Sequence, residues 1–180
     1  KNIATSNIGG LVGRTTALYY TQSSFEIGSE VYYRIQANDV DAKSVGDIVD
    51  FSVYAQINAQ DFNNVGGIAG QNEFTLTNNY FDGKVKGAQN IGGIAGQSRG
   101  QILLARVYTY AQTTISGETN VGGIAGEFIS CVAGQNVLIG YSYVSGANQN
   151  QGVFASNQNA GAIVGLISGG SIISSYADIT

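Results

Sequence analysis

The sequence predicts an all-β protein whose chain winds into a parallel β-solenoid, also called a β-helix. One observation is a glycine-rich septet that occurs five times, starting at residues 7, 64, 90, 120 and 159. A second is the shortness of the apolar runs, which are rich in Val, Ile, Tyr and Thr and are bounded by Gly, Asn, Asp and Ser, as strands are. A third is that no stretch has the sustained periodicity and caps of an amphipathic helix.

The septet spacing predicts the size of the coils. The starts at 64, 90, 120 and 159 are separated by 26, 30 and 39 residues. Fixed motifs with variable spacers are typical of solenoids with loop insertions. We expect about 4–6 coils of roughly 26–30 residues, with insertions, in one domain over residues 1–180. A right-handed course follows the usual preference of parallel crossovers.

Each septet is expected to form a corner of its coil. Val65 and Ile68 are three residues apart, so on a straight strand they would point to opposite faces. Gly66 and Gly67 lie between them and would let both face inward, because glycine reaches positive φ without a Cβ clash. The equivalent corner residues of the other strong copies are Gly92, Gly93, Ile94, Gly122, Gly123 and Ile124.

A further glycine ends each strong septet. Gly70, Gly96 and Gly126 occupy this position, where we expect close backbone approach or the next bend. Because Gly93 lies in the predicted bend and Gly100 in a spacer, valine is expected to destabilise the protein more at Gly93.

Stacked coils would place equivalent residues in ladders along the axis. One interior ladder is predicted to hold Ile68, Ile94, Ile124 and Ile163, with Leu11 at its end. A second would hold Val65, Ile91 and Val121. A motif with a tyrosine four residues after an aliphatic residue predicts a third column of Tyr80, Tyr108, Tyr141 and Tyr176. The leading asparagines would hydrogen-bond along the axis, as amide ladders do in stacked sheets: Asn64, Asn90, Asn120 and Asn159.

Residues 14–48 do not fit the repeat and are predicted to be an insertion within the first coil. We expect the insertion to project from the rod or to run beside it. It contains Asp39, Asp41 and Asp47, and Asp50 follows it. These acids lack the order of a calcium loop, because Lys43 takes the third ligand position and the glycine is displaced. No metal site is therefore predicted.

The septet of Asn7–Gly13 (NIGGLVG) and the run of Leu76–Val85 (LTNNYFDGKV) resemble the two halves of the GLUG repeat. The later copies carry Ile in place of the core Leu. The resemblance implies a β-solenoid from a large cell-surface or secreted protein, such as an adhesin. It supplies no catalytic residues, because the family's repeat has none.

Composition excludes several classes of function. The chain has no histidine, so Ser-His-Asp triads, Cys-His pairs and imidazole metal sites are ruled out. The carboxylates fall at unlike places in their coils, and no pair suited to glycoside cleavage is evident. Only 11% of residues are charged, with net charge -4, so there is no basic footprint for nucleic acid. The longest apolar runs fall short of the roughly 18 residues that a membrane span needs, so no membrane span is predicted. We therefore expect no enzyme and no cofactor.

The single cysteine, Cys131, cannot form an internal disulfide. A buried apolar filler is the expected role, since free cysteines are commonly buried, and a reactive or cross-linking thiol is the alternative.

The expected function is a structural or adhesive segment at the cell surface or outside the cell: a stalk, fibre or adhesin body. Neither end carries an evident cap, so further protein is expected at the solenoid ends, as more of the same chain or as another subunit of a filament. Glycans or a host or matrix surface are the other expected partners. The alternative function is a carbohydrate-binding module that uses the insertion and the exposed tyrosines Tyr19, Tyr20, Tyr32 and Tyr33.

Overall fold

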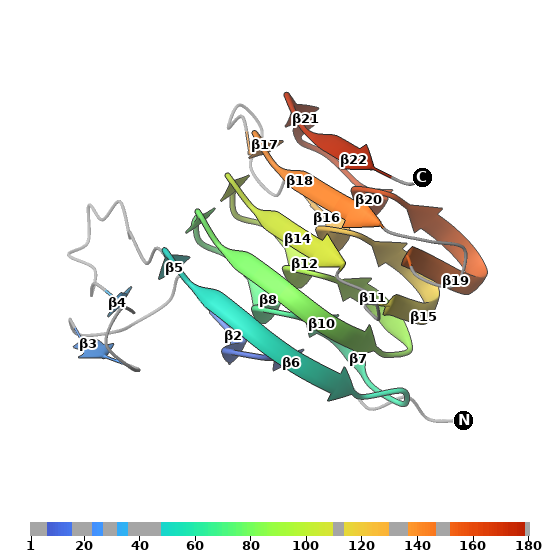
Figure 1. Cartoon of the computed structure of the whole chain (residues 1–180), viewed down its shortest axis with the longest axis horizontal. Coiled ribbons are helices and arrows are strands. Elements are labelled where there is room, and N and C mark those ends of the chain that lie inside the picture. Colours follow the sequence, from blue (N-terminus) through green and yellow to red (C-terminus); the bar gives the residue numbers. More distant parts are fainter. Residues whose placement is uncertain are drawn as a thin grey trace.

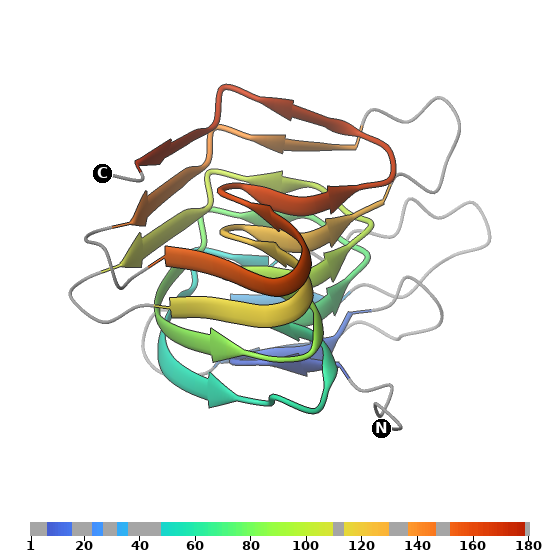
Figure 2. The same ribbon diagram turned by 90° about the vertical axis from the view of Figure 1, so that its right-hand side faces the viewer.

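The computed structural model describes residues 7–15, 23–26, 32–35, 48–109, 114–129, 137–146 and 152–178. Within these ranges every regular element is a β-strand, and the strands stack coil upon coil in three sheets (Figures 1 and 2). All strand pairs are parallel except the two that involve β4. The predicted parallel β-solenoid is thereby confirmed, while its handedness stays a prediction. The described residues include no helix that could cross a membrane.

Each coil passes through three sheets. The ten-stranded sheet, called sheet 1, holds β1 (Ile8–Gly9), β6 (Ser52–Asn58), β7 (Asn63–Gly66), β10 (Tyr80–Lys86), β11 (Gln89–Gly92), β14 (Arg106–Thr109), β15 (Thr114–Gly122), β18 (Tyr143–Gly146), β19 (Gly152–Gly161) and β22 (Tyr176–Asp178). Sheet 2 holds β2 (Val12–Arg14), β8 (Ala69–Asn72), β12 (Ala95–Ser98), β16 (Ala125–Phe128) and β20 (Val164–Ile167). Sheet 3 holds β3 (Ser23–Glu26), β4 (Tyr32–Ile35), β5 (Ile48–Val49), β9 (Leu76–Thr77), β13 (Ile102–Leu103), β17 (Leu138–Gly140) and β21 (Ser171–Ile173).

The aliphatic ladders form the core. Register pairs Ile91 with both Val65 and Val121, and all three side chains are fully buried. Ile68, Ile94 and Ile124 are likewise at 0% exposure, which confirms that both apolar residues of the septet face inward. Ile163 and Leu11, at the two ends of that ladder, are only partly buried because no further coil among the described residues covers them. The interior is completed by a ladder from sheet 3, in which Ile48, Leu76, Ile102 and Ile139 are buried and Ile172 is partly exposed.

The asparagine ladder is continuous over five coils. Asn64, Asn90, Asn120 and Asn159 each donate a hydrogen bond from Nδ2 to Oδ1 of the septet asparagine one coil earlier, over 2.8–2.9 Å, and Asn7 accepts the first of these bonds. The same four donors have left-handed backbones, with φ between 51° and 59°. Asparagine tolerates this conformation better than most residues. One residue type therefore supplies both the bend and the bond between coils.

The corner glycines serve a purpose other than the predicted one. None of Gly66, Gly67, Gly92, Gly93, Gly122 and Gly123 has a positive φ. A Cβ at Gly67 would collide with the Gly93 carbonyl of the next coil, and a Cβ at Gly93 would collide with that of Gly123. Glycine is required here because two backbones approach closely, while the left-handed turn is made by the asparagine. The glycine that ends each septet also meets neighbouring backbone, as expected for Gly70, Gly96 and Gly126.

The predicted single column of tyrosines is wrong. Tyr80 is in register with Arg106 rather than with Tyr108, and Tyr143 rather than Tyr141 stands above Arg106 and pairs with Tyr176. Tyr108 is in register with Asp82, two residues further along the strand. A shift of two residues keeps a side chain on the same face of a strand, so the alternation could not reveal the slip.

Tyr141 belongs to a second left-handed corner, between sheets 3 and 1. The residues that follow the sheet 3 strands in each coil have φ between 44° and 60°: Asp50, Asn78, Leu104, Tyr141 and Ser174. This corner has no consistent residue type, which is why its position was not recognised from the sequence. It turns the chain into strands β6, β10, β14, β18 and β22 of sheet 1.

The insertion contributes two strands to the N-terminal edge of sheet 3. β3 pairs with β4, and β4 pairs with β5, in both cases antiparallel. Figure 1 shows both strands beyond β5, beside the stack of coils. Its predicted bounds, Arg14 and Ile48, belong to the coil itself, since Arg14 is in register with Gln71 and Ile48 with Leu76. The described part of the insertion is thus a strand pair on the free edge of β5 and not a further parallel coil.

Candidate binding surface

The outer face of one half of sheet 1 carries four tyrosines among the described side chains, of which Tyr54 and Tyr176 are exposed and Tyr80 and Tyr143 half-buried. Its strands are β6, β10, β14, β18 and β22, which lie side by side in register. Alternate residues point inward, and Val53, Phe81, Val107 and Val144 are buried. The residues between them therefore face outward. We call this surface the tyrosine face; its two outward rows are Ser52, Tyr80, Arg106, Tyr143 and Tyr176, and Tyr54, Asp82, Ser145 and Asp178.

A shallow hollow of about 290 Å³ lies on this face next to the second corner. Tyr54 and Tyr80 line it with ring centroids 5.4 Å apart and ring planes at 50°. Tyr54 is 73% exposed and lies on β6, which pairs only with β10 among the described strands. Asp50, Asn78 and Arg106 supply a carboxylate, an amide and a guanidinium to the lining. Asn78 donates from Nδ2 to Asp50 Oδ1 at 2.6 Å, which holds both side chains in place.

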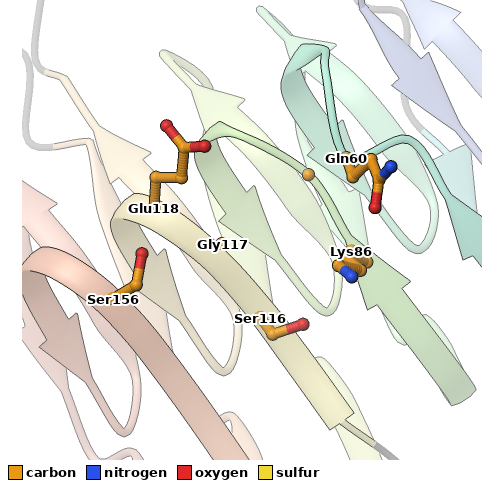
Figure 3. Close-up of a pocket in the computed structure, with 7 residues that line it drawn as sticks. Gln60, Lys86, Ser116, Gly117, Glu118 and Ser156 are labelled. Atoms are coloured by element: carbon orange, nitrogen blue, oxygen red, sulfur yellow. The ribbon is translucent and has the colours of Figure 1, made fainter.

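A second hollow of about 380 Å³ lies where sheet 1 bends (Figure 3). Gln60 follows β6, Lys86 ends β10, Ser116 and Glu118 come from β15, and Ser156 from β19. The lining supplies one cation, one carboxylate and hydroxyls. No side-chain hydrogen bond joins these groups in the described part of the chain. A hydroxyl without a base bonded to it is not an activated nucleophile, so the arrangement offers no catalytic pair.

Two of the carboxylates have structural partners. Glu127 Oε2 accepts from Gln97 Nε2 at 2.8 Å and from Asn90 Nδ2 at 3.0 Å, so it supports the asparagine ladder. Glu73 pairs with Arg14 at 3.1 Å. Among the described residues, no three His, Cys, Asp or Glu side chains converge as metal ligands would.

The predicted corner residues Gly66, Gly67, Ile68, Gly92, Gly93, Ile94, Gly122, Gly123 and Ile124 are all buried, so they build the fold and offer no surface. Several predicted positions lie outside the described residues: Cys131, Asp39, Asp41, Asp47, Tyr19 and Tyr20. Only the backbones of Tyr32 and Tyr33 are described, in β4. The hollow at Tyr54 could not be recognised from the sequence, because it depends on the second corner, whose residues have no common type.

Comparison with known proteins adds no relative. No protein-family model matches the chain, and neither a curated protein nor a solved structure matches it.

Proposed function

We propose that this chain is a structural or adhesive β-solenoid segment of a cell-surface or extracellular protein: a stalk, fibre or adhesin body. The fold suits this role because its core and its asparagine ladder extend by adding coils. The resemblance to the GLUG repeat supports the location and the role. A non-catalytic function fits a chain that is low in charge and free of histidine.

The observation that carries the proposal is the open C-terminal coil. Residues that are buried in earlier coils become exposed there. Phe128 is fully buried, whereas Ile167, its register partner in the last described coil, is 47% exposed. Ile139 is at 0% and its partner Ile172 at 37%. Exposed apolar groups beside unpaired strand edges favour pairing with further protein.

The two ends differ only in sheet 3. At the N-terminal end, β4 occupies the outer edge of β5, while β1, β2 and β6 each pair with a strand on one side only in the described structure. At the C-terminal end, β20, β21 and β22 each pair with a strand on one side only in the described structure. Asn159 Oδ1 likewise receives no donor from the described residues, although each earlier rung does. We therefore propose that a further coil of the same repeat covers the C-terminal end, and that the isolated chain meets this need by associating with a second copy.

Light scattering of purified residues 1–180 over a range of concentrations tests the proposal. We expect a mass above that of the monomer, and we expect Ile167→Glu to reduce the association. Leu104→Glu is the matched control, because Leu104 is 42% exposed but lies at a mid-stack corner away from the open end. A monodisperse monomer whose β20–β22 amides are protected from hydrogen exchange would show that the end is self-sufficient, and the proposal would fail.

A further inference from the structure

We propose that the tyrosine face binds carbohydrate, with the hollow at Tyr54 and Tyr80 as its main subsite. The face runs along the side of the stack, and its two most exposed rings, Tyr54 and Tyr176, lie on its outermost strands, β6 and β22. In Figure 1 its strands β6, β10, β14, β18 and β22 lie next to one another on the near side of the molecule.

Two of the aromatic rings of the face are exposed. Tyr54 and Tyr176 are 73% and 69% exposed, and the Tyr54 ring stands beside that of Tyr80. Tyrosine combines a large apolar ring face with a polar hydroxyl, which makes it frequent in binding sites. Tyr54 and Tyr80 form an adjoining pair, and contiguous exposed aromatic surface marks an interaction site more than a singly exposed ring does.

A polar lining surrounds the rings. Asp50 and Asn78 are fixed by their mutual hydrogen bond. The Arg106 guanidinium, in register with Tyr80, is exposed and has no hydrogen-bond or ion-pair partner in the described structure. The hollow therefore offers a carboxylate, an amide and an unpaired guanidinium within one small volume. Donors and acceptors converging beside an apolar surface are what an orienting ligand site needs.

Sugars match this combination. A pyranose ring has a face of C–H groups that packs on an aromatic ring and a rim of hydroxyls that hydrogen-bond to carboxylates, amides and guanidinium groups. A protein partner would instead call for a larger apolar centre, as interface cores have. The described outward rows contain tyrosines, Ser, Arg and Asp and no aliphatic residue.

The tyrosines repeat along the axis. Tyr80, Tyr143 and Tyr176 occupy the same outward row in the second, fourth and fifth strands of the face. Parallel strands lie about 4.8 Å apart, so Tyr80 and Tyr143 are separated by about 10 Å and the whole face is roughly 20 Å long. An oligosaccharide lying across the strands would meet one ring at the hollow and others further along. The ligand class is therefore an extended glycan chain rather than a single sugar.

The test is an array of neutral, amino-sugar and sialylated oligosaccharides probed with the full chain. We expect a subset to bind, and we expect Tyr54→Ala to weaken that binding at least about tenfold, as truncation of an anchor residue does. Tyr54→Phe keeps the ring and should retain most of the binding. Arg106→Gln should weaken it without unfolding the protein, because the side chain is exposed.

Phe62→Ala is the matched control, since Phe62 is an aromatic at 36% exposure that lies between β6 and β7, outside the tyrosine face. It should leave glycan binding unchanged. An array on which the wild-type chain binds no glycan overturns the inference. Binding that survives both Tyr54→Ala and Arg106→Gln overturns it too. A monomer in light scattering has no bearing on either result, so the two proposals fail separately.

Discussion

Asn120 offers the sharpest test of how the coils are joined. Its side chain is 4% exposed, donates to Asn90 Oδ1 and accepts from Asn159 Nδ2, both over 2.8 Å. Its backbone has φ of 55°. Replacement by alanine removes two hydrogen bonds, each worth about 1 kcal/mol net. It also places a Cβ-bearing residue without a polar side chain in the left-handed region, at about 1–2 kcal/mol. We expect Asn120→Ala to lower the free energy of unfolding by about 3–4 kcal/mol.

Asn120→Gly separates the two contributions. It loses the same hydrogen bonds but adopts the left-handed backbone freely, so the loss should be about 2–3 kcal/mol. The Asn120→Gly variant should therefore be more stable than the Asn120→Ala variant. Within a strand the usual order is the reverse. The measurement is equilibrium urea unfolding followed by circular dichroism.

Ser116 provides the control pair, because it lies within β15 and has no positive φ. There the glycine variant should be the less stable one by about 0.5–1 kcal/mol. Asn159→Gly gives a second comparison, since this exposed terminal rung makes only one ladder bond and should lose about 1 kcal/mol. If Asn120→Ala equalled or exceeded Asn120→Gly in stability, the left-handed corner would not be what selects asparagine, and the reasoning would be refuted.

Two further predictions concern packing. A Cβ at Gly100 would collide with the Phe74 backbone, and a Cβ at Gly93 would collide with the Gly123 carbonyl. Valine at either site should therefore lower the free energy of unfolding in urea by on the order of 1–3 kcal/mol. This corrects the expectation that Gly100 lies in a tolerant spacer, and a negligible loss at Gly100 would contradict it. Ile94→Ala should cost about 2–5 kcal/mol, because Ile94 is fully buried, while Ile172→Ala, at 37% exposure, should cost less than half as much. Equal losses in thermal or urea denaturation would count against the open C-terminal coil.

The repeat made much of the fold predictable from the sequence. Val65 and Ile68 recur with asparagine and glycine at fixed places, so their inward orientation and the asparagine ladder followed from stacking like on like. These features depend on local spacing and on the fact that each coil contacts its neighbours. They do not require knowledge of where any distant segment lies.

The glycine pair shows a different limit. Its presence correctly marked a corner, but the reason for glycine was misread as backbone freedom. Gly67 is needed because the Gly93 carbonyl of the next coil comes close, and that distance exists only once the coils are stacked. The left-handed conformation lies three residues earlier, at Asn64.

The sequence by itself thus determined the fold class, the apolar ladders and the amide ladder, because each repeats in every strong copy with the same local pattern. The tertiary structure alone decided the register of the tyrosine strands and the hollow at Tyr54. A slip of two residues preserves the inward and outward alternation. The alternation is therefore satisfied equally well when Tyr80 pairs with Tyr108 and when it pairs with Arg106, as it does in the structure. Only the second corner, where Asn78, Leu104 and Tyr141 turn the chain with no shared residue type, sets which side chains stand beside one another on the outer face.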